Sequence, residues 1–282
     1  MKILRIPSEM RAQVQAWQAA QLRIGFVPTM GNLHEGHLAL VRRARELSDR
    51  VVASVFVNPL QFNREDDLVE YPRTIESDID KLAAEDVDAV FAPDEAEMYP
   101  RGREAEPRLV IPQLDALMGE LEGASRPGHF AGVLTVVAKL FDIVQPNVTI
   151  FGEKDFQQLL LIRRMVEIKG LPVQIVAEPT VREADGLAMS SRNGYLSVDE
   201  RATAPALFRS LSCIREGLRA GKSFSTLQAQ ADTELRQAGF VPEYIELRRA
   251  ADLTQVTGPE EDRVILAAAW LGRARLIDNL RV

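Results

Sequence analysis

The stretch that decides the fold is Phe26–His37, which reads Phe-Val-Pro-Thr-Met-Gly-Asn-Leu-His-Glu-Gly-His. An apolar run ends in a loop with proline and glycine, and this loop delivers two histidines, His34 and His37, to the start of the next helix. Residues three apart on a helical turn share a face, so both imidazoles are expected on one side. Because a helix N-terminus carries unpaired N–H groups and a partial positive charge, the stretch predicts a phosphate or nucleotide site.

Strands and helices alternate around this stretch. The apolar patterns predict strands at 24–27, 51–57, 89–91, 148–151 and 173–177, and helices at 6–21, 38–47, 74–84, 130–144 and 155–168. Residues 51–57 are almost continuously apolar and β-branched, which is typical of a strand buried on both faces. Residues 93–129 are predicted to be mostly loop, with one short helix around 114–117. The alternation predicts an α/β fold in which an N-terminal Rossmann-like parallel sheet carries helices on both faces.

The pattern changes beyond Pro179. Ser197 and Glu200 fit a capping box that opens a helix through Leu218, and a second helix is expected over 223–238. Strand-like runs follow at 244–247, 264–271 and 275–279. Helices followed by consecutive strands predict a smaller C-terminal α+β domain, with a boundary near residue 180.

Composition excludes several classes of protein. The net charge of −7 argues against a general nucleic-acid binder, which needs a basic surface. Cys213 is the only cysteine, so no intramolecular disulfide can form. No run has the length of a membrane-spanning helix, and the N-terminus lacks the apolar region of a secretory signal. The expected location is the cytoplasm.

Two later stretches carry groups suited to phosphate. Residues 151–158 again lead from a strand into a helix, with Gly152 for close backbone approach, Lys154 as a mobile cation and Gln158 one turn further on. Residues 185–193 contain two serines followed by Arg192, a compact set of donors for phosphate. Each stretch, taken alone, could equally be a solvated turn.

Neutral amides follow the buried strand at 51–57. Asn58 and Gln61 could hold an alcohol or a carboxylate without requiring a counterion. Residues 126–129, Arg-Pro-Gly-His, precede a helix and could form a lid that carries a cation. Turn composition alone would also account for both segments.

The histidine pair has alternative explanations. The order His-Glu-Gly-His superficially resembles a zinc protease motif, but that motif needs histidines four apart with a glutamate beside the first. One histidine could instead cap the helix or pack in the core. No metal-ligating residue is therefore expected in the chain.

Taken together, the motifs resemble the pantothenate synthetase (pantoate–beta-alanine ligase) family of HIGH-type nucleotidyltransferases. The resemblance rests on Pro-Thr-Met-Gly with His34 and His37, on residues 57–62, on 126–130, on 151–158 and on 185–193. Residues Met-Ser-Ser-Arg at 189–192 look like the counterpart of the KMSKS loop of class I aminoacyl-tRNA synthetases. Asn32 and Asn147 depart from the commoner family residues.

The resemblance implies an ATP-dependent ligase that forms a carbon–nitrogen bond and releases AMP. (R)-Pantoate would be activated as pantoyl adenylate with release of pyrophosphate, and β-alanine would then displace AMP to give pantothenate. ATP is the expected co-substrate, Mg²⁺ its accompanying ion and a homodimer the expected assembly. Residues 1–179 would be the ATP- and pantoate-binding domain, and residues 180–282 a lid.

The resemblance also implies roles by matched position. His34, His37, Lys154 and Arg192 are the expected catalytic residues, with His37 as the active-site histidine. Gln61 and Gln158 are expected to hold pantoate, with Asn58 nearby, and Gln61 would later meet β-alanine. The expected ATP-binding residues are Met30, Gly31, Asn32, Leu33, His34, Glu35, Gly36, His37, Gly152, Glu153, Lys154, Asp155, Val181, Met189, Ser190, Ser191 and Arg192.

Three rivals remain. Another HIGH-type nucleotidyltransferase, acting on a different acid or phosphate, would share the histidine stretch. A catalytically silent ATP-binding protein could use the same scaffold. A histidine-based metal hydrolase would carry stoichiometric zinc.

Overall fold

The structure, a computed structural model, describes residues 1–63, 65–258 and 262–282. These residues form two compact units. The first comprises Met1–Glu153 and Leu161–Glu178, and the second comprises Lys154–Leu160 and Pro179–Val282. The chain thus passes into the second unit at Pro179, and the short segment 154–160 groups with that unit. The functional division into a binding domain and a lid stays a prediction.

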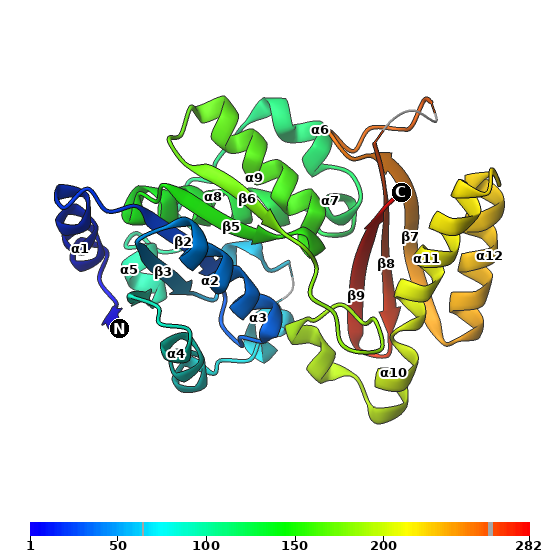
Figure 1. Cartoon of the computed structure of the whole chain (residues 1–282), viewed down its shortest axis with the longest axis horizontal. Coiled ribbons are helices and arrows are strands. Elements are labelled where there is room, and N and C mark those ends of the chain that lie inside the picture. Colours follow the sequence, from blue (N-terminus) through cyan, green and yellow to red (C-terminus); the bar gives the residue numbers. More distant parts are fainter. Residues whose placement is uncertain (64, 259–261) are drawn as a thin grey trace. The chain divides into compact units, whose positions relative to one another are not determined.

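A six-stranded parallel sheet forms the centre of the first unit (Figure 1). Its strand order is β1-β4-β3-β2-β5-β6, so the order reverses between β2 and β5. The strands are β1 (Lys2–Leu4), β2 (Ile24–Thr29), β3 (Arg50–Val55), β4 (Ala89–Phe91), β5 (Val148–Gly152) and β6 (Gln174–Glu178). Sequence patterns identified all of these except β1, a three-residue edge strand too short to show a periodicity.

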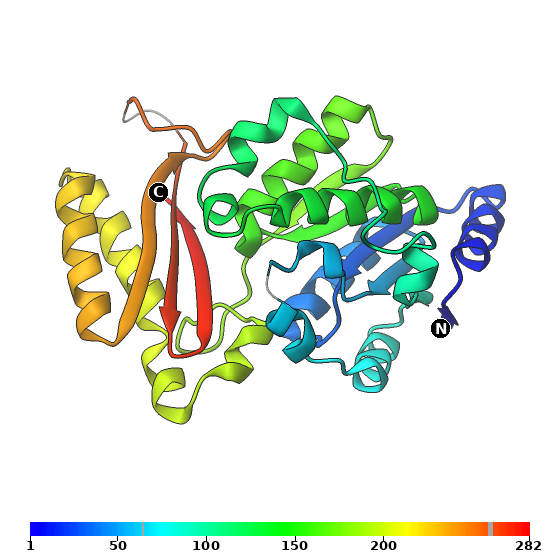
Figure 2. The ribbon, with the colours of Figure 1, turned by 180° about the vertical axis from the view of Figure 1, so that it is seen from behind.

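Helices cover both faces of this sheet, α2 on one and α8 on the other, as comparison of Figures 1 and 2 shows. The longer helices are α1 (Pro7–Ala19), α2 (Glu35–Leu47), α4 (Ile75–Ala84), α8 (His129–Val144) and α9 (Phe156–Lys169). The region 93–129 holds more helix than expected, in four short pieces: α5 (Glu95–Met98), η2 (Pro112–Leu114), α6 (Asp115–Met118) and α7 (Glu122–Ser125). Three other short segments lie outside this region: η1 (Pro59–Gln61), α3 (Glu65–Glu70) and η3 (Glu153–Asp155).

The apolar run at β3 explains why two helical layers are needed. Val51, Val52 and Ala53 are all fully buried, although successive side chains of a strand point to opposite faces. Val51 and Ala53 pack in a cluster with Val41 of α2. On the other face, Phe26 of β2 makes an edge-on contact with Phe141 of α8, with ring centroids 6.5 Å apart. The sequence prediction of a strand buried on both sides is confirmed.

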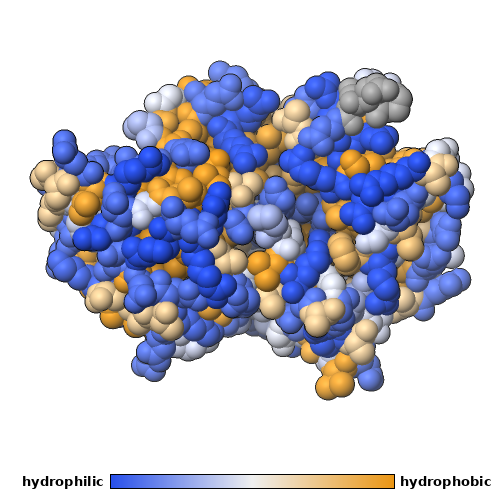
Figure 3. All heavy atoms as spheres, viewed as in Figure 1, coloured by the Kyte–Doolittle hydropathy of each residue, from blue (hydrophilic) through white to orange (hydrophobic). Residues whose placement is uncertain are grey.

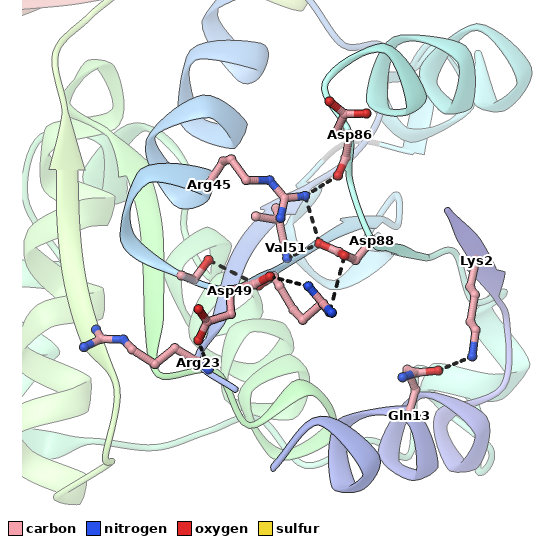
Figure 4. Close-up of polar contacts among 10 residues, drawn as sticks. Lys2, Gln13, Arg23, Arg45, Asp49, Val51, Asp86 and Asp88 are labelled. Carbon is pink, nitrogen blue, oxygen red and sulfur yellow. Dashed lines mark hydrogen bonds and ion pairs between the residues drawn. The ribbon is translucent and has the colours of Figure 1, made fainter. Parts of the chain in front are cut away.

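Carboxylate side chains accept hydrogen bonds at the amino-terminal end of the sheet (Figure 4). Asp88 accepts hydrogen bonds from the backbone N–H of Val51 and from the guanidinium of Arg45, each at 2.8 Å. Asp49 accepts from the backbone N–H of Arg23, also at 2.8 Å. These contacts lie at the opposite end of the strands from the loops that carry the candidate site, so they secure the scaffold without entering it.

The second unit packs helices on a three-stranded antiparallel sheet of order β7-β8-β9. Its elements are η4 (Ser191–Tyr195), α10 (Val198–Thr203), α11 (Ala206–Arg219), α12 (Phe224–Gln237), β7 (Phe240–Arg249), β8 (Arg263–Leu271) and β9 (Ala274–Arg281). Leu211 and Ile214 of α11 and Leu235 of α12 are buried in one cluster with Ile265 of β8. This is the smaller α+β arrangement that the sequence predicts.

One helix expectation is wrong. The capping box of Ser197 and Glu200 is present, but the helix it opens ends at Thr203, and α11 begins only at Ala206. Pro205 lies between them. A proline lacks the N–H of the helical ladder and its ring clashes with the preceding turn, which separates the expected single helix into two.

The surface is polar over most of the face drawn in Figure 3, where hydrophilic side chains surround scattered apolar ones. Across the described ranges, no helix has the length and apolar character needed to span a membrane.

Candidate functional site

The loop after β2, residues 30–37, is here called the histidine loop. Its backbone turns through two left-handed residues, Gly31 at φ +83° and Asn32 at φ +51°. Asparagine tolerates this conformation better than most side chains, so the departure at Asn32 fits the loop. A Cβ added at Gly31 would lie 2.9 Å from a carboxylate oxygen of Asp78, which requires glycine there.

Asp78 holds the histidine loop in place. Its carboxylate is fully buried and accepts hydrogen bonds from the backbone N–H groups of Asn32 and Leu33, each at 2.8 Å. The Thr74 hydroxyl donates to the same carboxylate at 3.1 Å, and Lys81 donates to the Leu33 carbonyl at 2.7 Å. Helix α4, which carries Asp78 and Lys81, therefore fixes the backbone that leads to the histidines.

The two histidines cap α2 and stack on each other. His34 is the N-cap residue, and its Nδ1 accepts from the backbone N–H of Gly36 at 3.2 Å. His37 Nδ1 accepts from the backbone N–H of His34 at 3.3 Å, and the ring centroids are 4.1 Å apart. A neutral imidazole whose Nδ1 accepts carries its proton on Nε2. Each ring therefore combines a capping nitrogen with a second nitrogen that is a donor.

The helix begins at Glu35, three residues earlier than the predicted start at Leu38. Glu35 pairs with Arg42 in the second turn, and this hydrogen bond lowers the pKa of the Glu35 carboxyl. Its position in the first turn is also favourable for a negative charge.

The turn after β3, residues 58–61, is here called the amide turn. Asn58 is 1% exposed, and its Oδ1 accepts from the backbone N–H of Leu60 and from the hydroxyl of Tyr99, at 3.2 and 2.8 Å. Asn58 Nδ2 donates to the Gly132 carbonyl at 3.2 Å and to Gln61 Oε1 at 3.0 Å. The amide turn is thus a buried network of neutral groups.

The histidine loop and the amide turn meet at one contact. Gln61 Nε2 donates to the sulfur of Met30 at 3.0 Å. On the other side, the backbone carbonyl of Gln61 lies 2.8 Å from Nδ1 of His129, and Arg126 lies 3.0 Å from Nε2 of that histidine. His129 is buried at the start of α8, so residues 126–129 pack beneath the amide turn.

These loops lie where an open parallel sheet is expected to bind ligands. Both follow the carboxyl ends of their strands, and β2 pairs with β5, the point at which the strand order reverses. Gly152 ends β5, and a Cβ added there would meet nothing within 4 Å. The backbone of Gly152 can therefore be approached closely by a ligand.

Lys154 and residues 185–193, here called the serine–arginine stretch, belong to the second unit. The Lys154 side chain is 18% exposed, and the Asn279 amide donates to its backbone carbonyl at 2.9 Å. Lys154, Ser190 and Asn193 line one small cavity. Within the described residues, no donor reaches the buried Oδ1 of Asn193.

Local hydrogen bonds shape the serine–arginine stretch. The Ser190 hydroxyl accepts from the backbone N–H of Arg192 at 3.2 Å, and Met189 N–H donates to the Val181 carbonyl at 3.0 Å. Arg182 anchors the segment by a two-pronged pair with Asp278 at 2.7 and 2.8 Å, and Asp278 is 4% exposed. The fold therefore places Val181 beside Met189, two residues predicted to border ATP.

The predicted residues are distributed over both units. Met30 to His37, Asn58, Gln61, Gly152 and Glu153 belong to the first unit. Lys154, Asp155, Gln158, Val181 and residues 189–192 belong to the second. Gln158 is half-buried in α9, one turn beyond Lys154.

Sequence reasoning missed the residues that hold these loops. Asp78 looks like an ordinary acidic residue in the first turn of a helix, and Tyr99 lies in a stretch rich in proline and charge. Neither has a local signal that links it to a loop about 40 residues away. Only tertiary contacts reveal them.

The comparisons with known proteins cover nearly the whole chain. The family model described as pantoate-beta-alanine ligase matches residues 2–281. The chain belongs to the pantoate-beta-alanine ligase family. Among curated relatives, the pantothenate synthetase of Thioalkalivibrio sulfidiphilus is 55% identical over 100% of this chain and 98% of its own length. That of Nitrosococcus oceani is 52% identical, with the same shares covered.

Solved structures of this ligase family have the same fold. The crystal structure of pantothenate synthetase from Thermus thermophilus superimposes with a TM-score of 0.92 at 45% identity, covering 99% of both chains. A pantoate-beta-alanine ligase from Francisella tularensis, complexed with beta-gamma ATP and beta-alanine, gives a TM-score of 0.83 at 35% identity, covering 100% of this chain and 97% of that one. The predicted family, fold class and enzyme class are confirmed.

Proposed function

We propose that this chain condenses (R)-pantoate with β-alanine to form pantothenate, using ATP and passing through pantoyl adenylate. The observation that carries the proposal is the match of the ligase family over residues 2–281, on a chain that keeps the histidine loop and the amide turn in contact. A relative of 35% identity is described as a complex with beta-gamma ATP and β-alanine, which supports both substrates.

The reaction has two displacement steps. A carboxylate oxygen of pantoate attacks the α-phosphorus of ATP, and the bond to the leaving pyrophosphate breaks. The amine of β-alanine then attacks the activated acyl carbon, loses a proton, and expels AMP as the carbon–oxygen bond breaks. Neither step needs a covalent intermediate on the enzyme, so positioning and stabilisation of phosphate charge would supply the catalysis.

The histidine loop is proposed as a phosphate seat. With Nδ1 of His34 and His37 occupied by backbone N–H groups, the neutral rings would donate from Nε2 to phosphate oxygens. These hydrogen bonds would strengthen as negative charge builds in adenylation. His37 is the proposed active-site histidine.

The second unit would supply cationic and hydroxyl donors. Lys154 and Arg192 are proposed to contact phosphate oxygens, with Ser190 and Ser191 adding short-range donors. Gly152, Glu153 and Asp155 would border the nucleotide, and Val181 and Met189 would lie near it. The hydrogen bond between Met189 and Val181 is consistent with a shared role.

The amide turn is proposed as the pantoate site. Gln61 and Gln158 would hold the hydroxyl and carboxylate oxygens of pantoate, with Asn58 supporting Gln61. Gln61 is 9% exposed and donates to Met30, so its amide lies where the histidine loop and the amide turn meet.

Mg²⁺ is proposed to arrive with ATP. The described residues contain no group of three or more His, Cys, Asp or Glu side chains that could hold a metal ion. Mg²⁺ dehydrates reluctantly and is commonly held by phosphate oxygens and water, so it needs no such group. A homodimer in the cytoplasm completes the proposal, and the molar mass in solution tests the assembly.

A coupled assay for AMP tests the function. ATP, pantoate and β-alanine together should give AMP and pantothenate in equal amounts, and omission of any one should abolish pantothenate. ATP–pyrophosphate exchange that requires pantoate but not β-alanine would isolate the first step. Exchange that proceeds without pantoate, or with another acid in its place, would instead favour a different nucleotidyltransferase.

A further inference from the structure

The buried network at the amide turn has a fixed direction, because two backbone groups set it. The Leu60 N–H can only donate, so the atom of Asn58 that it meets at 3.2 Å is the oxygen. The Gly132 carbonyl can only accept, so the atom of Asn58 that it meets at 3.2 Å is the nitrogen. The Asn58 amide therefore has a single orientation.

This orientation passes to both neighbours of Asn58. The Asn58 nitrogen faces Gln61, so Gln61 turns its oxygen toward Asn58, at 3.0 Å, and its nitrogen toward Met30 of the histidine loop, also at 3.0 Å. The Asn58 oxygen faces Tyr99, so the tyrosine hydroxyl must be the donor of the 2.8 Å hydrogen bond. The chain of donors runs from Tyr99 through Asn58 to Gln61.

Tyr99 is suited to a permanent donor role. It is 1% exposed at the end of α5, and its ring meets Phe56 edge-on with centroids 5.9 Å apart. Burial, with a smaller contribution from Glu106, raises the pKa of the hydroxyl well above its ordinary value. The proton needed for the hydrogen bond to Asn58 is therefore retained at every pH at which the protein would work.

The close approach of α8 to the amide turn restricts movement of the hydrogen-bonded network. A Cβ added at Gly132 would lie 2.1 Å from the Leu60 carbonyl oxygen, so the helix and the amide turn touch backbone to backbone. The Asn58 side chain bridges that contact. It cannot turn over without breaking hydrogen bonds to both backbone segments.

We infer that Tyr99 is a positioning residue for pantoate recognition: its hydroxyl adds a third fixed hydrogen bond to the Asn58 amide that the two backbone groups orient, and so helps to hold the Gln61 amide with its NH₂ group toward the substrate. The inference rests on the proposed function. A site built in this way selects a substrate atom that accepts hydrogen bonds, such as a carboxylate or hydroxyl oxygen of pantoate. The Met30 thioether, which meets this NH₂ group at 3.0 Å, is only a weak acceptor that such an oxygen would readily replace.

The first test is Tyr99→Phe, which keeps the ring and removes the hydroxyl. The KM for pantoate should rise about tenfold, the equivalent of one buried hydrogen bond, while the KM for ATP changes less than about twofold. Tyr244→Phe, the same change on β7 in the second unit, is the control and should leave both constants unchanged. Equal rises in both constants would indicate general loosening and would overturn the inference, as would an unchanged KM for pantoate.

A double-mutant cycle tests whether Tyr99 acts through Gln61. In a Gln61→Met background, which has no amide to orient, Tyr99→Phe should add almost nothing to the KM for pantoate. The same rise in both backgrounds would show that Tyr99 acts by another route. The wild-type assay separates this result from failure of the proposed function, since that failure would appear as no pantothenate formed by the unaltered protein.

Asn58→Asp tests the direction of the network should Tyr99→Phe not fold. The carboxylate still accepts from Leu60 and Tyr99, but its second oxygen now faces two acceptors, the Gly132 carbonyl and Gln61 Oε1. Gln61 should therefore turn over and present its oxygen to the substrate, and the lost hydrogen bond to Gly132 should lower the thermal midpoint. The KM for pantoate should rise more than in Tyr99→Phe, with the thermal midpoint and the KM for ATP measured in parallel. Wild-type pantoate binding in Asn58→Asp would refute a fixed direction.

Discussion

The histidine loop and the amide turn follow neighbouring strands, yet different chemistry holds each of them. The histidine loop is tied by the carboxylate of Asp78 to two backbone N–H groups, and its own side chains cap a helix. In the amide turn the side chains pair with neutral groups centred on Asn58, and the guanidinium of Arg126 reaches the backbone carbonyl of Gln61 at 3.5 Å. Both arrangements are buried, but the group at the centre of the first is charged and the group at the centre of the second is neutral.

The difference fits the ligand proposed for each loop. A carboxylate that accepts backbone N–H groups fixes the loop while leaving the imidazoles as donors for phosphate, whose charge changes during the reaction. A neutral amide network discriminates by the position of donors and acceptors, because a mismatch leaves a buried polar group without a partner. One loop is therefore suited to the reacting phosphate and the other to recognition of the acid.

The largest effect is expected from Asp78→Ala. The change leaves the N–H groups of Asn32 and Leu33 without their acceptor, and such unsatisfied buried groups should lower the free energy of unfolding by about 4 kcal/mol. Urea denaturation measures this. Asp80→Ala removes a more exposed carboxylate from the same helix and should change stability by less than about 0.5 kcal/mol. Similar losses in both variants would mean that Asp78 does not hold the loop.

His37→Ala should act on catalysis more than on stability. Loss of one donor to the reacting phosphate should raise the barrier to adenylation by about 3 kcal/mol, measured as pantoate-dependent pyrophosphate exchange. Loss of its cap on the His34 N–H should cost only about 1 kcal/mol of stability.

His37→Glu separates these two roles. Glutamate at the third helical position can accept from the N-cap N–H, so stability should return, but the donor to phosphate does not. Recovery of the exchange rate in His37→Glu would show that His37 acts only as a cap.

Gly132→Ala probes the amide turn by displacing it. The added methyl group would lie 2.1 Å from the Leu60 carbonyl oxygen, so the turn must shift, at a cost of about 2 kcal/mol. Pantoate binding should weaken more than ATP binding, as measured by the two KM values. Gly119→Ala, where the nearest atom is at 3.4 Å, is the matched control and should be nearly neutral. A rise confined to the KM for ATP would contradict the assignment of the amide turn to pantoate.

Local signals were sufficient to predict the central strands and the longer helices of the first unit, but not strand β1 or the short helices of residues 93–129. The β-branched run at β3 and the loop from Pro28 to His37 each show their structure within about a dozen residues. The predicted site residues were chosen from the order of their motifs along the chain, and their roles stay predictions. Pro205 interrupts the helix predicted through Leu218, although the rest of that stretch is periodic.

The supporting residues could not be predicted, for a physical reason. Asp78 lies 46 residues from Asn32, and Tyr99 lies 41 from Asn58, so each acts only after the sheet has brought distant loops together. An acidic residue in a first helical turn and a tyrosine before a proline are common in any chain. What gives them a role is the orientation of backbone N–H and carbonyl groups, which a residue pattern does not contain.

The smallest expected effect is a difference between the two loops in how their contribution to stability depends on pH. The hydrogen bond to Arg42 lowers the pKa of Glu35, so the pair stabilises the fold above the ordinary carboxyl value of 4.5 and loses this contribution as the pH falls through the lowered pKa. Both side chains are 46% exposed, so Glu35→Gln should cost only about 0.5 kcal/mol at neutral pH, and its difference from wild type should vanish in acid. Gln61→Met in the amide turn replaces one neutral group by another, so its stability difference should stay constant over the same range. Urea midpoints measured for both variants from neutral pH down to about pH 3 provide the comparison, and a constant difference for Glu35→Gln would show that its charge contributes nothing to the histidine loop.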